Sequence, residues 1–180
     1  LQQGSRAVDA WRRVNPGVRL VPLRAVIAEA TGEGLVGDAD VVVDCLDNFP
    51  TRLLLNALAV RRGLPMIHAG VSGWCGQLTF LHPPATACLA CLVPQAPPQE
   101  LFPILGPTAG LLGCLAALEA LTFLSGGGPR LRGRLRRSPA VGPPGPATPS
   151  GSRASISAGP PPLPRGETRW LRPCPPPTPE

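Results

Sequence analysis

Three consecutive valines followed by a helix-capping pair constrain the fold of this chain most strongly. The run Val41–Val43 is β-branched and apolar, which is typical of a parallel strand covered on both faces. Asp47 and Asn48 then offer a helix N-cap, and Pro50–Arg62 places leucines and alanines on one broad helical face. Leu64–Ala69 predicts a second strand after a tight connection. Strand, helix and strand in this order predict a right-handed crossover in a doubly wound α/β sheet.

The segments on either side extend the α/β pattern. Residues 5–14 place apolar side chains at helical spacing and predict a helix, while the alternation in Val18–Ile27 predicts another strand. Glu33–Asp40 is a short polar stretch that contains glycine. Gly73–Leu81 ends in a third strand-like run, and the proline-rich residues 92–103 predict a loop.

Ile104–Leu124 is a long apolar segment with Glu119 as its one acidic residue. Its length suffices to cross a bilayer. Glu119 in the C-terminal half and Pro107 near the start argue against a span, because a charge is costly in lipid and proline shortens the uninterrupted helix. We favour a helix packed on the sheet and expect no membrane contact, with a membrane-anchored protein through residues 104–124 as the alternative.

Composition changes abruptly near Gly128. Residues 1–128 contain 8 Arg against 9 Asp and Glu, whereas residues 129–180 contain 9 Arg against 2 Glu, together with much Pro, Gly and Ser. The second mixture buries too little apolar surface to offset the entropy of ordering. We therefore predict a domain over residues 1–128 and a disordered, low-complexity Pro/Arg-rich tail over residues 129–180. A solvated linker is the favoured interpretation of the basic run Arg130–Arg137, with contact to RNA, anionic lipid or an acidic protein as the alternative.

Six cysteines are scattered through the chain, and no secretory signal opens it. Cys88 and Cys91 form a Cys-x-x-Cys pair, which favours a reducing compartment over a disulfide scaffold and predicts a cytoplasmic protein. The same spacing lets both thiolates turn toward one metal and suits one half of a tetrahedral zinc site. Cys45 at a strand end and Cys114 in the apolar helix are expected to be buried and inert, and no cysteine is assigned as a nucleophile.

The histidines and aromatic residues add no second candidate site. His68 and His82 are separated by a strand and a loop, so we expect structural roles for both rather than metal ligation. Aromatic residues make up 4% of the chain and are scattered, which leaves no stacking platform for single-stranded nucleic acid. We expect no specific nucleic-acid partner.

The junction between the first predicted strand and the helix that follows it contains Asp47, Asn48 and Arg52. In open α/β sheets, ligands bind outside the carboxyl ends of the strands, so Asp47 and Asn48 are expected to face a nucleotide crevice. A carboxylate there can hold Mg²⁺, and Arg52 can approach phosphate. The alternative is that Asp47 and Asn48 merely cap the helix.

Four motifs in a fixed order resemble the second half of a ThiF/MoeB/HesA domain, an adenylating domain of the ubiquitin-activating-enzyme type. They are Asp-Cys-Leu-Asp-Asn-Phe-x-x-Arg at residues 44–52, Gly-Gln-Leu-Thr-Phe at residues 76–80, Cys-Leu-Ala-Cys-Leu-Val-Pro at residues 88–94, and the glycine-spaced helix at residues 106–120. The resemblance covers residues 1 to about 126. It implies a Rossmann-like sheet, of which this chain carries the C-terminal portion.

The resemblance also implies an activity. Members of the family use ATP and Mg²⁺ to adenylate the C-terminal glycine of a ubiquitin-like or sulfur-carrier protein, and they form homodimers or heterodimers. Asp47 matches the family's Mg²⁺- and ATP-binding aspartate and is expected to be catalytic, with Asn48 and Arg52 lining the same crevice. A second cysteine pair completes a structural zinc site in the family, and here Cys174 is the one cysteine in that region, so the implied zinc ligands are Cys88, Cys91 and Cys174.

The sequence departs from the family in one respect that leaves the activity open. The glycine-rich ATP loop and the βαβ unit that carries it would lie before Leu1, and we expect the chain to be a piece of a longer protein. A catalytically inactive relative that serves as a carrier-binding or dimerisation module is therefore the alternative to an enzyme. Carrier-dependent exchange of pyrophosphate into ATP distinguishes the two.

Overall fold

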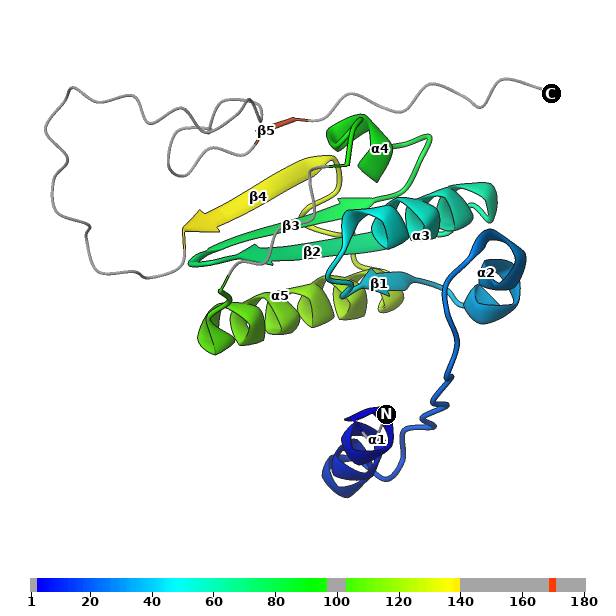
Figure 1. Cartoon of the computed structure of the whole chain (residues 1–180). Coiled ribbons are helices and arrows are strands. Elements are labelled where there is room, and N and C mark those ends of the chain that lie inside the picture. The colour runs from blue at the N-terminus through cyan, green and yellow to red at the C-terminus, as the bar shows by residue number, and fades with distance from the viewer. Residues whose placement is uncertain (1–2, 97–102, 140–168, 171–180) are drawn as a thin grey trace, which may run out of the picture.

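The computed structural model describes residues 3–96, 103–139 and 169–170, and a five-stranded sheet lies at its centre (Figure 1). The strands follow one another across the sheet in chain order as β1 (Val42–Asp44), β2 (Met66–Ser72), β3 (Cys75–Leu81), β4 (Arg134–Pro139) and β5 (Arg169–Trp170). β1 and β2 run parallel, with Val43 opposite Ile67, and the other neighbouring pairs are antiparallel. The sheet is mixed, and the expected α/β class is confirmed.

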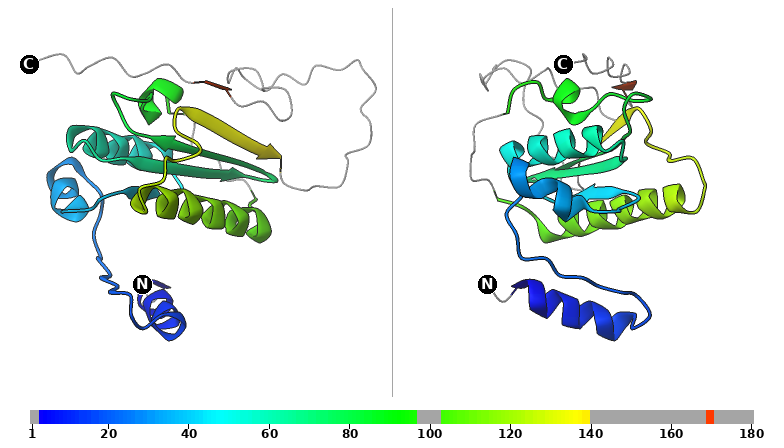
Figure 2. Two further views of the ribbon diagram at one scale, coloured as in Figure 1. Left: turned by 180° about the vertical axis from the view of Figure 1, so that it is seen from behind. Right: turned by 90° about the vertical axis from the view of Figure 1, so that its right-hand side faces the viewer.

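Helices cover both faces of the sheet (Figures 1 and 2). α3 (Phe49–Arg61) and α4 (Leu89–Leu92) lie on one face, and α5 (Gly106–Leu124) lies on the other. α2 (Glu29–Val36) packs beside α3. α1 (Gln3–Val14) stands apart from the sheet in both views, and it confirms the helix predicted for residues 5–14.

The predicted strand–helix–strand unit is the part of the fold that positions the candidate site. Asn48 is the N-cap of α3, and its Oδ1 accepts a hydrogen bond of 2.9 Å from the backbone N–H of Thr51. Pro50 in the first turn suits a helix start, because its missing N–H would have no partner inside the helix. Gly63, with φ of 63°, turns the chain after α3 toward β2. Local signals therefore define this unit at both ends of the helix.

Two apolar cores lie on opposite faces of the sheet, because neighbouring residues of β2 point to opposite sides. Met66 faces α3 and α4, and Ile67 faces α5. The core under α3 and α4 contains Leu55, Ala59, Met66, Leu81 and Leu89. The core under α5 contains Ile67, Leu78, Phe80, Leu112 and Ala116. β2 is thus covered on both faces, as its continuous apolar sequence predicts.

Gly76 is the point of closest approach between β3 and α5, and it gives a stability prediction. A Cβ atom there would lie 2.4 Å from Cδ1 and 2.9 Å from Cγ of Leu112. We expect Gly76→Ala to lower the free energy of unfolding by about 1–3 kcal/mol through overpacking, measured by urea denaturation. Gly34→Ala in the exposed part of α2 is the matched control, because no heavy atom lies within 4 Å of a Cβ there. The control substitution should raise the free energy of unfolding by about 1 kcal/mol or less. Equal urea midpoints for the two variants would contradict the packing argument.

Glu119 is buried in α5 and is satisfied by backbone groups rather than by a cation. Its carboxylate accepts hydrogen bonds from the backbone N–H groups of Arg130, at 3.1 Å, and of Leu131. These bonds tie the chain after α5 back onto the helix. The acidic residue that interrupts the long apolar segment therefore joins α5 to the connection that leads into β4.

α5 is the one described helix that is long and apolar enough to cross a membrane, and its two sides differ. Leu112 and Ala116 are buried against the sheet, as expected for a helix packed on it. The outer side exposes Leu111, Leu118 and Leu121. Packing on the sheet accounts for the inner side, and the outer side is free for a further contact.

Val18–Ile27 is not a strand, and this prediction was wrong. The segment has no regular structure, and Val18, Val21, Leu23 and Val26 are exposed. Alternation of apolar residues specifies which side chains share a face, but a strand also requires a neighbour for its backbone groups. No strand among the described residues pairs with this segment.

α2 is a helix that the sequence did not predict. Its glycines, Gly32 and Gly34, disfavour a helix by about 1 kcal/mol each relative to alanine. Two features offset this. The Oγ1 of Thr31 accepts a hydrogen bond of 3.2 Å from the backbone N–H of Ala28 at the start of the helix. Gly32 also lies so close to Leu58 of α3 that a Cβ would be 2.2 Å from Cδ1 of that leucine, so the glycine allows the two helices to pack.

The sheet continues past the domain end predicted at residue 128. β4 pairs with β3 from Thr79 opposite Leu135 to Cys75 opposite Pro139. The exposed Arg136 of β4 suits this position, because backbone hydrogen bonds hold a strand near the edge of a sheet while its charged side chain reaches water. Residues 140–168 and 171–180 lie outside the described residues, so disorder there stays a prediction.

Candidate functional site

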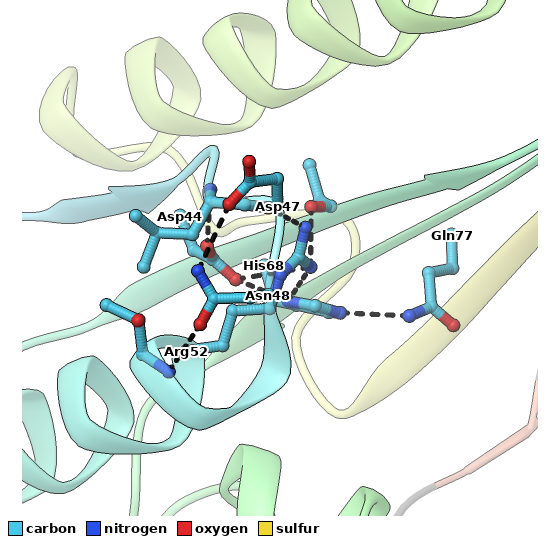
Figure 3. Close-up of polar contacts among 9 residues, drawn as sticks. Asp44, Asp47, Asn48, Arg52, His68 and Gln77 are labelled. Atoms are coloured by element: carbon cyan, nitrogen blue, oxygen red, sulfur yellow. Dashed lines mark hydrogen bonds and ion pairs between the residues drawn. The ribbon is translucent and has the colours of Figure 1, made fainter. Parts of the chain in front are cut away.

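The loop between β1 and α3, residues 45–48, carries two of the three residues predicted to bind nucleotide, Asp47 and Asn48, and the third, Arg52, lies in α3 (Figure 3). It begins at the carboxyl end of β1, which is the edge where ligands bind in open α/β sheets. Asp47 is exposed, and its Oδ1 accepts a hydrogen bond of 3.1 Å from Nδ2 of Asn48. Asn48 also caps α3, so its side chain joins Asp47 to the first turn of the helix. The capping interpretation holds for Asn48, whereas Asp47 presents its carboxylate to solvent.

Asp44, the last residue of β1, is fully buried and makes the central contacts of the site. Its Oδ1 accepts a hydrogen bond of 3.0 Å from the backbone N–H of Leu46. Its Oδ2 lies 2.6 Å from Nδ1 of His68 and 3.5 Å from Nη1 of Arg52 (Figure 3). A buried carboxylate needs both hydrogen bonds and an opposite charge, and Asp44 has both.

Arg52 comes from the first turns of α3 and is 7% exposed. Its guanidinium donates to the carbonyl oxygen of Ala69 at 3.0 Å and to that of Leu46, and it also faces Asp44. Arg52 therefore connects the loop to the end of β2. The sequence placed Arg52 in a crevice beside phosphate, and the structure shows its guanidinium beneath the loop and engaged by protein groups. A phosphate contact stays a prediction.

His68 lies opposite Asp44 in the register of the parallel strands. It is 1% exposed, and its Nε2 lies 3.0 Å from Nε2 of Gln77 on β3. The sequence predicts a structural role for His68 but does not connect it with Asp44 or Gln77. A signal was present: each of the two predicted parallel strands places a polar residue after an apolar run, and parallel strands in register bring such residues together.

Cys45 and Cys114 are both exposed, so the prediction that they are buried was wrong. Cys45 immediately follows the last residue of β1, and Cys114 is an exposed residue of α5. Partial burial raises the pKa of the Cys45 thiol, and the charge of Asp44 raises it further, while Arg52 acts in the opposite direction. A raised pKa keeps this thiol protonated at neutral pH, which makes it a poor nucleophile.

An apolar cavity of about 400 Å³ lies beside β1. Its walls come from β1, from the loop, from α2 and from α3, and include Val36, Val42, Val43, Cys45, Leu46 and Leu58. None of the lining residues is cationic. The cavity has the size of a small-molecule site, but its walls suit apolar groups and offer no countercharge to a phosphate.

The cysteine pair predicted to bind zinc is brought together at α4. Cys88 is the N-cap of α4, and its Sγ lies 3.4 Å from Sγ of Cys91. Two thiolates on one tetrahedral zinc ion, at about 2.3 Å from the metal, are a little under 4 Å apart, so the pair fits half of such a site. Cys174 lies outside the described residues. Among the described residues, no group of three or more potential ligands is close enough to hold a metal ion.

Comparison with known proteins identifies relatives of this chain. The sequence model of the ThiF family matches residues 5–141. Adenylyltransferase and sulfurtransferase MOCS3 of Bos taurus is 41% identical over 135 residues, which cover 72% of this chain and 30% of the relative. SAMP-activating enzyme E1 of Haloferax volcanii is 38% identical over 130 residues, which cover 69% of this chain and 48% of the relative. The chain thus spans less than half of the length of these relatives.

Solved structures confirm the architecture. Escherichia coli MccB with ATP superposes with a TM-score of 0.63 at 18% identity, covering 74% of this chain and 43% of MccB. MccB in complex with N-formylated MccA gives a TM-score of 0.65 at 17% identity, covering 74% of this chain and 45% of MccB. At this level of identity the likeness shows a shared fold.

Proposed function

Because this chain belongs to the ThiF family, we propose that it takes part in the ATP-dependent adenylation of the C-terminus of a ubiquitin-like or sulfur-carrier protein. One similar relative is named as an adenylyltransferase and another as an activating enzyme. The observation that carries the proposal is the exposed carboxylate of Asp47 at the carboxyl end of β1, in a loop held from below by Asp44 and Arg52.

The chemistry assigned to this site is an acyl adenylation. A carboxylate oxygen of the carrier's C-terminal glycine attacks the α-phosphorus of ATP, a new bond to phosphorus forms, and pyrophosphate leaves with the electrons of the broken bond. Asp47 would hold Mg²⁺, which neutralises charge on the phosphates. Asn48 fixes the carboxylate of Asp47 through its amide. The contribution of this chain to the rate is positioning and charge compensation.

The test of this function is pyrophosphate exchange. The full-length protein, supplied with ATP, Mg²⁺ and a ubiquitin-like carrier that ends in glycine, should incorporate labelled pyrophosphate into ATP. The exchange should require the carrier, and a carrier without its terminal glycine should not support it. An intact full-length protein that gives no carrier-dependent exchange would contradict the proposal.

A binding or dimerisation module is the second candidate function, and the outer side of α5 favours it. Leu111, Leu118 and Leu121 are exposed there, and the small residues Gly110 and Gly113 beside them would allow a second helix to approach closely. We infer that α5 contributes to a homodimer or heterodimer contact. The two functions are compatible, because an activating domain can also dimerise.

A structural zinc site is part of the proposal and gives a metal prediction. We expect about one zinc ion per chain in the purified full-length protein, held by Cys88, Cys91 and Cys174 in a cytoplasmic, reducing environment. Cys91→Ser should remove the metal. Cys75→Ser, at an exposed cysteine on β3, is the matched control and should retain it. Elemental analysis decides the point, and clearly less than stoichiometric zinc in the unmodified protein rules against the site.

A further inference from the structure

The protonation of His68 follows from its partners. Asp44 and Arg52 are both buried beside His68, and Oδ2 of Asp44 lies 3.5 Å from Nη1 of Arg52. Two groups contact Nδ1 of His68: Oδ2 of Asp44 at 2.6 Å, which can only accept, and Nη1 of Arg52 at 3.2 Å, which can only donate. We place the proton on Nδ1, because the contact with the carboxylate is the shorter one. The other ring nitrogen is then an acceptor, which matches the amide nitrogen of Gln77 at 3.0 Å. The contact with Gln77 is thus compatible with the tautomer that donates to Asp44.

Both backbone groups of Leu46 are held by the charged residues of this cluster. Its N–H donates to Oδ1 of Asp44, and its carbonyl accepts from Nη2 of Arg52. Leu46 immediately precedes Asp47, so the position of Leu46 determines where the exposed carboxylate lies. The Asp44 carboxylate is in turn oriented by its contact with His68. Contacts therefore run without a break from Gln77 on β3 to the loop that carries Asp47 and Asn48 (Figure 3).

We propose that His68 is a positioning residue of the adenylation site: its Nδ1–H orients Asp44, and Asp44 together with Arg52 fixes Leu46 and so places Asp47. The catalytic consequence rests on the proposed function, while the effect on the loop does not depend on it. Residues that orient metal ligands through a hydrogen bond affect metal affinity or activity by about 10–100-fold when they are replaced. His68 reaches Asp47 through Asp44 and Leu46, and an effect at the lower end of this range is expected.

Two substitutions of His68 by an amide residue distinguish a positioning role of its Nδ1–H from simple filling of space. His68→Asn places an amide N–H near the position of Nδ1 and should keep the bond to Asp44, whereas His68→Gln places it near Nε2 and should lose that bond. Thr79→Val is the control, because Thr79 is buried directly opposite His68 on β3 and its hydroxyl has no hydrogen-bond partner among the described residues. If His68 only fills space, His68→Asn should preserve the position of the loop no better than His68→Gln does.

Amide hydrogen exchange measures the loop without any assay of activity. The observable is the exchange rate at Leu46 divided by that at Leu58 in the middle of α3, so that a general loss of stability cancels. We expect this ratio to rise about tenfold in His68→Gln and to stay near the wild-type value in His68→Asn and Thr79→Val. An unchanged ratio in His68→Gln, or equal ratios in the two amide variants, overturns the proposal.

The imidazole nitrogens give a second readout that needs no variant. Nitrogen-15 NMR of the full-length protein should show a proton on Nδ1 of His68. A proton on Nε2 alone would leave Asp44 without its donor and would overturn the proposal.

Pyrophosphate exchange then tests the catalytic part. In His68→Gln we expect KM for Mg·ATP to rise about tenfold, with KM for the carrier unchanged, and we expect His68→Asn to restore the wild-type value. A rise confined to KM for the carrier overturns the positioning role. If the unmodified protein shows no carrier-dependent exchange, the proposed function fails, and hydrogen exchange and NMR still decide whether His68 positions the loop.

Discussion

Asp47→Asn should lower carrier-dependent pyrophosphate exchange by about a hundredfold or more, because the substitution removes the charge that would hold Mg²⁺ on the triphosphate. The fold should not change, since Asp47 is exposed and its carboxylate bonds, among the described residues, only to the neighbouring Asn48. Steady-state exchange with Mg²⁺ and ATP varied, together with urea unfolding, measures both parts of the prediction.

Asp38→Asn is the control for this experiment. Asp38 is also an exposed aspartate, but it lies in the connection between α2 and β1 rather than at the carboxyl end of a strand. A general effect of surface charge on ATP binding would appear in both variants, whereas a specific role appears in Asp47→Asn alone. Wild-type exchange in Asp47→Asn would remove this carboxylate from the mechanism.

Arg52→Met should be the most destabilising single substitution of a charged residue in α3. The methionine keeps part of the apolar stem, but the buried carboxylate of Asp44 loses its countercharge, and the carbonyl groups of Leu46 and Ala69 lose their donor. Leaving one member of a buried ion pair alone costs about 3–5 kcal/mol. Urea denaturation of the full-length protein, followed by circular dichroism, measures the loss.

Arg61→Met supplies the comparison on the same helix. Arg61 is 45% exposed at its side chain and faces Glu29 and Glu33 at 4.0 and 3.9 Å. Exposed pairs of this kind contribute about 1 kcal/mol or less. If Arg52→Met loses no more stability than Arg61→Met, the guanidinium of Arg52 does not hold the loop, and the role assigned to Arg52 here would have to be withdrawn.

The sequence position of Arg52 predicts a place in the crevice because it does not show which way the side chain turns. An arginine in the first turns of a helix after a strand end can turn outward to phosphate or inward to a buried carboxylate. The choice depends on Asp44 and on the carbonyl of Ala69, which is 17 residues away in the chain. Spacing within residues 44–52 contains no information about that distant group.

The sequence by itself determined the elements whose signals are local. The β-branched run of β1, the cap at Asn48 and Gly63 after α3 each act within a few residues, and the predicted strand–helix–strand unit was found. The location of Asp47 followed from the same unit, because the residue after a parallel strand must lie at the ligand-binding edge of the sheet.

Only the tertiary structure decided the elements and contacts that need a partner from elsewhere. Val18–Ile27 has the pattern of a strand, but no described strand pairs with it, whereas the arginine-rich β4 is a strand because β3 lies beside it. Asp44, Arg52 and His68 form one buried cluster because β1, α3 and β2 bring them together in space. Backbone pairing and the neutralisation of buried charge depend on what is adjacent in the fold, and a local pattern of residues does not specify that.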